Sequence, residues 1–137
     1  SSFLVQIIGG GEPYGNLNNY GRIYNQFYVH KEEASGILWL ENNYKESFIY
    51  ADIYAYKKII SLWGFNNMII EDILPETIDK KSYVFLDYRN SLKNIASKEY
   101  SSTKESTRDY LNFNFPKEFL NNNKNKIYNN GGSEIFK

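Results

Sequence analysis

The chain has 137 residues, a length that suits one domain, and its sixteen basic and sixteen acidic side chains give no net charge. That balance argues against a general nucleic-acid binder, which carries a basic face. The absence of cysteine excludes disulfides and thiolate metal sites, and the single histidine excludes a histidine-rich metal site. We therefore expect one domain over residues 1–137, with no metal, no cofactor and no nucleic-acid partner.

The sequence also lacks the usual signals of membrane insertion and secretion. No apolar run approaches the ~18 residues that cross a bilayer, and the apolar stretch that follows Ser1 lacks the basic start of a signal peptide. Because the chain opens at Ser1 without a methionine, we expect a processed protein or a piece cut from a longer one.

Residues 9–29 are rich in glycine and asparagine and contain Pro13, so they predict a long irregular loop. Its three consecutive glycines fit neither of the common nucleotide-binding glycine patterns. The aromatic residues of this loop could cover the faces of sugars, or they could pack over the sheet or against a membrane-side neighbour. Packing is the simpler of the two interpretations.

The first helix is predicted over residues 31–43. Glu32 and Glu33 suit the first turn, where the helix dipole favours anions, and the apolar residues that follow recur at helical spacing. Because the two glutamates are adjacent in sequence, their side chains diverge. They are therefore expected on a solvated face rather than as an acid–base pair.

A change of period marks the next two elements. The β-rich run over 47–51 predicts a buried strand, and residues 53–63 return to helical spacing. Asp52 is suited to cap the start of this helix and Gly64 to end it. Two more strands are predicted over 67–70 and 82–88.

A strand, a helix and a strand joined by short links predict a right-handed parallel crossover. Parallel sheets carry a layer on each face, and the helix over 31–43 is one candidate for a covering layer. The sequence thus predicts a single three-layer α/β domain with a small, mostly parallel sheet.

The remainder of the chain shows weaker signals until its end. Residues 90–110 are polar and predict a surface excursion, and the run after Pro116 predicts a short helix. The chain closes with a predicted strand, turn and strand around Gly131 and Gly132. This turn could be a structural staple or a cradle for an anion or sugar. The staple is favoured, because too few residues follow Gly132 to form the helix that an anion cradle needs.

Asp52 is the most informative polar residue, since it follows a predicted buried strand and opens a helix. Ligands of open α/β sheets bind beyond the carboxyl ends of the strands, where Asp87 and Arg89 also belong. We therefore predict a polar cleft formed by these three residues, in which Arg89 neutralises a carboxylate and hydroxyl-rich ligands bind. The simpler alternative is that Asp52 only caps its helix. No nucleophile motif is present, so no catalytic residue is assigned.

Several segments, taken in order, match a recognisable pattern. An acidic helix with the spacing E-x-x-x-x-x-W-L is followed by a strand that ends in Ala-Asp, then by Y-x-x-L-x-Y-x-N, and last by N-K-I-Y-x-N-G-G-S-E-I. These motifs are carried here by Glu33, Trp39 and Leu40, by Ala51 and Asp52, by Tyr83, Leu86, Tyr88 and Asn90, and by residues 125–135. The chain resembles the C-terminal extracytoplasmic region of a family of archaeal polytopic membrane proteins.

The membrane-embedded part of that family resembles C-type glycosyltransferases and oligosaccharyltransferases. The resemblance implies a domain at the extracytoplasmic face of the cell membrane, whose partners are the membrane-embedded part of its parent chain and a lipid-linked sugar or glycan. It assigns no catalytic residue to this region. The alternatives are a self-standing sugar-binding or protein-interaction module, and a small enzyme that uses Asp52 and Asp87.

Overall fold

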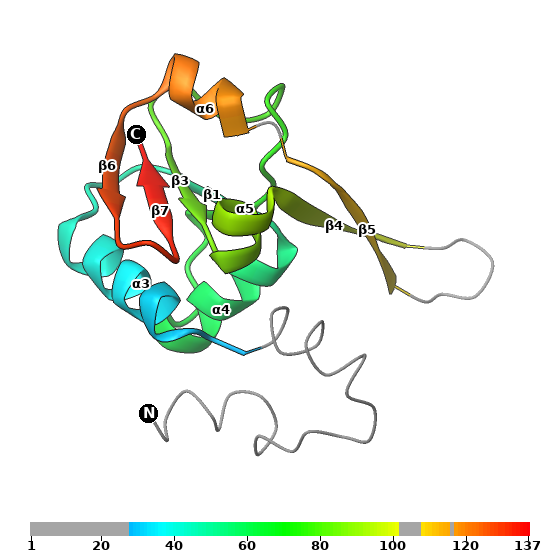
Figure 1. The fold of residues 1–137 in the computed structure, drawn as a ribbon. Coiled ribbons are helices and arrows are strands. Elements are labelled where there is room, and N and C mark those ends of the chain that lie inside the picture. Colours follow the sequence, from blue (N-terminus) through cyan, green and yellow to red (C-terminus); the bar gives the residue numbers. More distant parts are fainter. Residues whose placement is uncertain (1–27, 102–107, 116) are drawn as a thin grey trace.

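The computed structural model describes residues 28–101, 108–115 and 117–137. The loop predicted over 9–29 therefore lies almost wholly outside the described residues, as does Pro116. The part of the chain that is described forms a five-stranded mixed sheet, flanked by helices, and a separate two-stranded hairpin (Figure 1).

The parallel half of the sheet is formed by β1 (Ile49–Ala51), β2 (Ile69–Glu71) and β3 (Tyr83–Leu86). β1 lies in the middle and pairs in parallel with both neighbours, so that Ile49 is opposite Ile69 on one side and Tyr83 on the other. The helix α4 (Ile53–Trp63) is the crossover between β1 and β2. The predicted parallel sheet and its crossover helix are confirmed.

The antiparallel half of the sheet comes from the end of the chain. β7 (Glu134–Phe136) pairs with β3, and β6 (Lys126–Asn129) pairs with β7, which gives the strand order β2-β1-β3-β7-β6. The predicted C-terminal strand–turn–strand is therefore confirmed, and it is part of the main sheet. Its last strand, β7, lies between β3 and β6.

Alternate residues of each strand face two separate apolar layers, because side chains of a strand point to opposite faces. On one face, Ile49 and Phe85 pack under α3 (Lys31–Asn43) and α4, and Figure 1 shows these two helices together on one side of the sheet. On the other face, Val84 packs with Leu120 of α6 (Lys117–Asn123) and with residues between β2 and β3. Both faces are covered, as the three-layer prediction required.

Residues 90–110, expected as a polar surface excursion, form regular structure where the chain is described. The predicted strand over 82–88 ends earlier, at Leu86, and α5 (Tyr88–Lys93) follows it. β4 (Ile95–Ser101) then pairs antiparallel with β5 (Arg108–Asn114) to form a hairpin that projects from the body of the domain (Figure 1). Its strands were missed because polar and charged side chains make up about half of each, so that the apolar residues give no clear strand signal.

The turn between β6 and β7 is a structural staple that is fastened to α3. Asn130 Nδ2 and Ser133 Oγ donate hydrogen bonds to the Glu32 carbonyl, at 2.8 and 3.0 Å. Asn130 Oδ1 in turn accepts from the backbone N–H groups of Gly132 and Ser133, at 3.1 and 3.0 Å. Those N–H groups are therefore bonded within the turn, which disfavours the anion-cradle alternative.

Two details of the staple differ from the prediction. Of Asn130, Gly131 and Gly132, which were all expected at positive φ, only Gly131 has it, with φ of 91°. Gly132 is needed for a different reason, because a Cβ there would lie 2.6 Å from the Glu32 Cβ. Ile127 was expected to anchor β6 in the core, yet its side chain is 39% exposed.

Candidate functional site

The candidate site lies at the carboxyl ends of β1 and β3, where two aspartates follow the two adjacent strands. Asp52 caps α4 by accepting a hydrogen bond from Ala55 N at 2.9 Å. Asp87 caps α5 by accepting one from Asn90 N at 3.1 Å. Because β1 and β3 are parallel neighbours, the two caps lie side by side at one end of the sheet.

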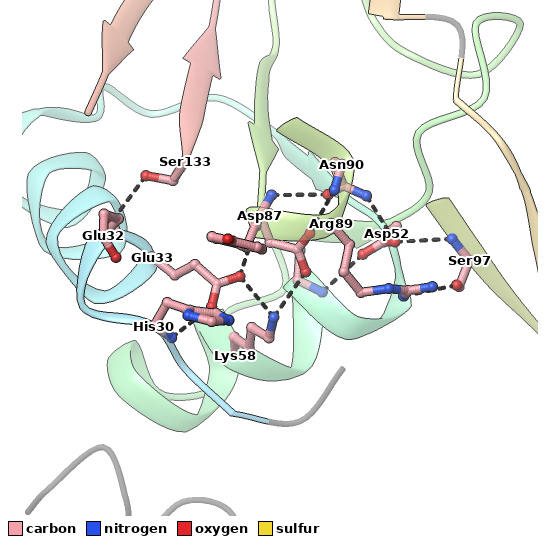
Figure 2. A network of polar contacts seen from close by, with 12 residues as sticks. His30, Glu32, Glu33, Asp52, Lys58, Asp87, Arg89, Asn90, Ser97 and Ser133 are labelled. Carbon is pink, nitrogen blue, oxygen red and sulfur yellow. Dashed lines mark hydrogen bonds and ion pairs between the residues drawn. The ribbon is translucent and has the colours of Figure 1, made fainter. Parts of the chain in front are cut away.

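Asn90 joins the two aspartates (Figure 2). Its Oδ1 accepts a hydrogen bond from Asp87 N at 2.9 Å, and its Nδ2 donates to Asp52 Oδ2 at 3.1 Å. The structure thus brings Asp52 and Asp87 together, as their positions after adjacent parallel strands predicted. Asn90 had been assigned no role beyond its place in a family motif.

Asp52 does more than cap its helix. Its Oδ2 also accepts a hydrogen bond from Ser97 N of β4 at 2.9 Å, across a separation of 45 residues in sequence. The same carboxylate therefore holds the first turn of α4, the side chain of Asn90 and the base of the projecting hairpin. Its side chain is 1% exposed, so these bonds form in a buried environment.

Arg89 reaches this cluster but does not form the ion pair that was expected of it. Its guanidinium donates to Ser97 Oγ at 3.1 Å and lies over the ring of Tyr54, 4.9 Å from the ring centre. The cation that neutralises Asp87 is Lys58 of α4, whose Nζ lies 3.0 Å from Asp87 Oδ2. The expected role of Arg89 is thus taken by a lysine on another element.

Lys58 also binds a second carboxylate, that of Glu33, at 2.7 Å (Figure 2). Glu33 Oε2 accepts a further hydrogen bond from Tyr88 N at 2.8 Å, and Glu33 Oε1 accepts one from His30 N at 2.7 Å. The expectation that Glu33 lies on a solvated face is wrong, because its side chain is fully buried. Its Oε2 instead contacts Lys58 of α4 and the backbone N–H of Tyr88 of α5.

Burial dominates the electrostatics of this cluster. It raises the pKa of Glu33 to about 7, with Asp87 adding to the shift and Lys58 opposing it. It also raises the pKa of Asp52 to about 6, with Asp87 again adding and the hydrogen bonds from Ala55, Asn90 and Ser97 opposing. For Lys58, burial works against the charged form, but Asp87 and Glu33 outweigh it and the pKa is raised.

These contacts limit the chemistry that the cluster can perform in this arrangement. Every oxygen of the three carboxylates accepts at least one hydrogen bond from within the domain. Lys58 is held protonated between two carboxylates, so it is a poor nucleophile or base. The described residues contain no group of three or more side chains suited to hold a metal ion. Ligand binding by Asp52, Asp87 and Arg89 stays a prediction.

Two local signals in the sequence could have pointed to the missed members of the cluster. Lys58 stands three residues after Ala55 and one before Ile59, within the stripe of α4 that faces the core. The pair Asp87 and Asn90 has the spacing of a capping box, which marks the start of α5. No comparable signal in the sequence indicates that Ser97 belongs to the cluster, because its position depends on the pairing of β4 with β5.

A family model described as "Predicted membrane protein (DUF2206)" matches residues 1–136. No curated protein and no solved structure matches the chain. Within the described ranges, no helix has both the length and the apolar character needed to cross a membrane.

Proposed function

Because the chain belongs to the DUF2206 family of predicted membrane proteins, we propose that it is an extramembrane, extracytoplasmic domain of a polytopic membrane protein. In this proposal the parent protein acts in cell-surface glycan transfer or assembly. The domain supports the handling of a lipid-linked sugar or its acceptor, and its main partner is the membrane-embedded part of the same parent. It performs no chemistry of its own.

One observation carries the non-catalytic part of the proposal. Asp52, Asp87 and Lys58 form the candidate site, yet their charged groups are engaged in contacts that join α3, α4, α5 and β4. Groups that act on a substrate must be able to reach it. The glycan part is supported by the resemblance of the sequence motifs to a membrane family whose membrane-embedded part is glycosyltransferase-like.

The location of the domain is tested by cysteine labelling of the full-length parent. The chain contains no cysteine of its own, and Asn122 is exposed on α6, so Asn122→Cys introduces one reactive thiol into this domain. A membrane-impermeant maleimide should label the variant in intact cells, with the parent lacking the substitution as the control. Labelling that appears only after lysis would place the domain on the cytoplasmic side and contradict the proposal.

The catalytic part is tested with the purified chain. Sugar nucleotides, lipid-linked sugars and glycosides should remain unchanged on incubation with it. Turnover that disappears in Asp52→Asn would show that the chain is an enzyme. Binding of a free glycan by the isolated chain, without turnover, would favour the alternative of a self-standing sugar-binding module.

The glycan role needs the parent protein. Removal of this domain from the parent should reduce the cell-surface glycan while the remaining protein still accumulates in the membrane, as measured by immunoblotting of membrane fractions. An unchanged glycan with the domain absent would exclude the supporting role.

A further inference from the structure

The end of the sheet opposite to the polar cluster carries an unusual concentration of lysine. We define the basic rim as residues 44–48, which lead into β1, residues 79–82, which lead into β3, residues 124–125, which precede β6, and Lys137, which follows β7. These segments meet because the parallel strands begin, and β7 ends, at the same end of the sheet.

Direct contacts hold the segments of the rim together. Ser47 Oγ donates to the carbonyl of Lys81 at 2.9 Å, and Lys45 N donates to Tyr83 Oη at 3.0 Å. Lys137 N donates to the carbonyl of Asn125 at 2.8 Å. The rim is therefore a surface of fixed shape, although its segments come from four places in the sequence.

The charge of the rim contrasts with that of the whole chain. The chain is neutral, whereas the rim contains five lysines and only two carboxylate side chains, namely Lys45, Lys80, Lys81, Lys124 and Lys137 against Glu46 and Asp79. Burial lowers the pKa of Lys124, while the nearby Asp79 opposes the shift and the charge of Lys137 adds to it. Lys124 and Lys137 are thus close enough to interact, and the excess of lysine over carboxylate side chains on the rim would attract an anionic partner.

Exposed aromatic rings accompany the lysines. Phe48 is 40% exposed within the rim, and Phe65 is 79% exposed in the segment that leads into β2 at the same end of the sheet. The backbone of that segment is held in place, since Asn66 Oδ1 accepts from Met68 N at 2.9 Å and Ile49 N donates to the Met68 carbonyl at 2.9 Å. Phe65 is therefore presented to solvent by an ordered segment.

We propose that the basic rim, together with Phe48 and Phe65, docks on the anionic phospholipid headgroups of the membrane that holds the parent protein. Lysines held near an anionic leaflet are attracted to its surface potential, and aromatic rings insert at the boundary between headgroups and acyl chains. An acidic protein surface would match the lysines, but it gives no reason for rings exposed beside them. This inference rests on the proposal that the chain is an extramembrane domain, and it adds the face that meets the membrane.

Vesicle binding by the purified chain tests the charge requirement. The chain should co-sediment with vesicles of phosphatidylglycerol and phosphatidylcholine, less so as salt is raised, and weakly with phosphatidylcholine alone. Lys45→Glu/Lys81→Glu should lower the partition coefficient at least about tenfold, because each lysine near an anionic surface favours binding by about fivefold. Both side chains are exposed, and the hydrogen bonds of these residues use backbone atoms.

The matched control is Lys31→Glu/Lys98→Glu, which changes the net charge equally at exposed positions away from the rim. It should keep most of the binding. Equal losses in the two double variants would show that only total charge matters and would overturn the assignment of this face. Absence of binding to the anionic vesicles at low salt would overturn the proposal altogether.

A fluorescence measurement tests the orientation independently. An environment-sensitive dye on Phe65→Cys should shift to shorter wavelength when vesicles are added, while the same dye on Leu111→Cys, an exposed position of the projecting hairpin, should not. A shift at position 111 alone would assign membrane contact to the projecting hairpin and overturn the proposed face. Intact-cell labelling can place the domain on the extracytoplasmic side while the dye at position 65 does not respond to vesicles. In that case only the docking face is wrong and the proposed function stands.

Discussion

Lys58 neutralises two buried carboxylates, Glu33 and Asp87, that are supplied by separate parts of the chain. An ion pair of this kind gives little net stability relative to apolar packing, because burial of the charges is costly. Removal of one partner strongly destabilises the folded state, however, since it leaves the other charges buried without compensation. We therefore expect the cluster to contribute more to the relative placement of α3, α4 and α5 than to stability.

The first prediction concerns this lysine. Lys58→Met should lower the free energy of unfolding by about 3–5 kcal/mol, because Glu33 and Asp87 lose their shared cation. The adjacent Lys57 is exposed and contacts Tyr110, so Lys57→Met should cost less than about 1 kcal/mol. Urea unfolding measures both. Equal costs would mean that the buried ion pairs are not formed in solution.

The second prediction follows from the pKa of Glu33, which burial raises from 4.5 to about 7. A carboxyl with a raised pKa favours the folded state at low pH, and that contribution is lost as the pH rises through 7. Between about pH 8 and about pH 6, Glu33 should therefore add about 1 kcal/mol to the free energy of unfolding.

The contribution of Glu33 is isolated by measuring the same pH range in Glu33→Gln. Burial lowers the pKa of His30, which opposes the gain at the acidic end, but His30 is present in both proteins and so cancels in the comparison. The two proteins should differ in pH dependence by the contribution of Glu33. Identical pH profiles would show that its pKa is not raised.

At the scale of elements, the contact between α3 and the C-terminal turn depends on glycine. A Cβ on Gly36, in the middle of α3, would lie 2.3 Å from Ser133 Oγ and 3.2 Å from a ring carbon of Phe85. Glycine lowers helix propensity, so an alanine in its place ordinarily stabilises a helix. Here the close approach of β7 and its turn outweighs propensity.

The third prediction is that Gly36→Ala destabilises the domain by about 1–3 kcal/mol, as overpacking does, although the same change would stabilise an isolated helix. Ser35→Ala is the control, because Ser35 is exposed on the same helix. It should change stability by less than about 0.5 kcal/mol. Gly36→Ala should cost less in a Ser133→Ala background than in the unchanged chain, since the closest atom is then absent. The single Ser133→Ala variant measures the separate cost of losing the hydrogen bond to the Glu32 carbonyl. Thermal unfolding measures these changes in stability. A Gly36→Ala variant that is more stable than the unchanged chain would refute the close contact.

At the scale of the whole molecule, the sheet is completed only by the last residues of the chain. β7 lies between β3 and β6, and Ile135 and Phe136 are fully buried on its two faces. Both apolar layers therefore depend on a strand of three residues at the end of the sequence. Loss of this strand would therefore remove a fully buried side chain from each apolar layer.

The fourth prediction concerns that strand. Deletion of residues 126–137 should abolish cooperative unfolding, and Phe136→Ala should cost about 3–5 kcal/mol, as large-to-small changes in a core do. Ile127→Ala, on the edge strand β6, should cost less than about 1.5 kcal/mol, because much of its side chain is already exposed. A truncated chain that unfolds with full cooperativity and unchanged stability would show that the staple is dispensable.

The sequence by itself determined those elements whose signals are local. Asp52 and Gly64 mark the two ends of α4, and the glycine-rich turn separates β6 from β7. The change from strand period to helix period and back between residues 47 and 70 implies a parallel crossover. Each of these signals comes from residues that are close together in the sequence. The sequence placed Asp52 and Asp87 after two strands of one predicted parallel sheet, and that these strands are neighbours, so that the two aspartates meet, is a result of the fold.

Only the tertiary structure decided what surrounds those aspartates. Whether Glu33 and Lys58 are solvated or buried depends on which elements pack against them, and their partners lie 25 or more residues away in sequence. The hairpin of β4 and β5 also depends on contacts that local signals do not reveal. Its two strands become stable only when each supplies the other's backbone hydrogen bonds. Charge and burial at a site are properties of packed neighbours, which a single sequence does not bring together.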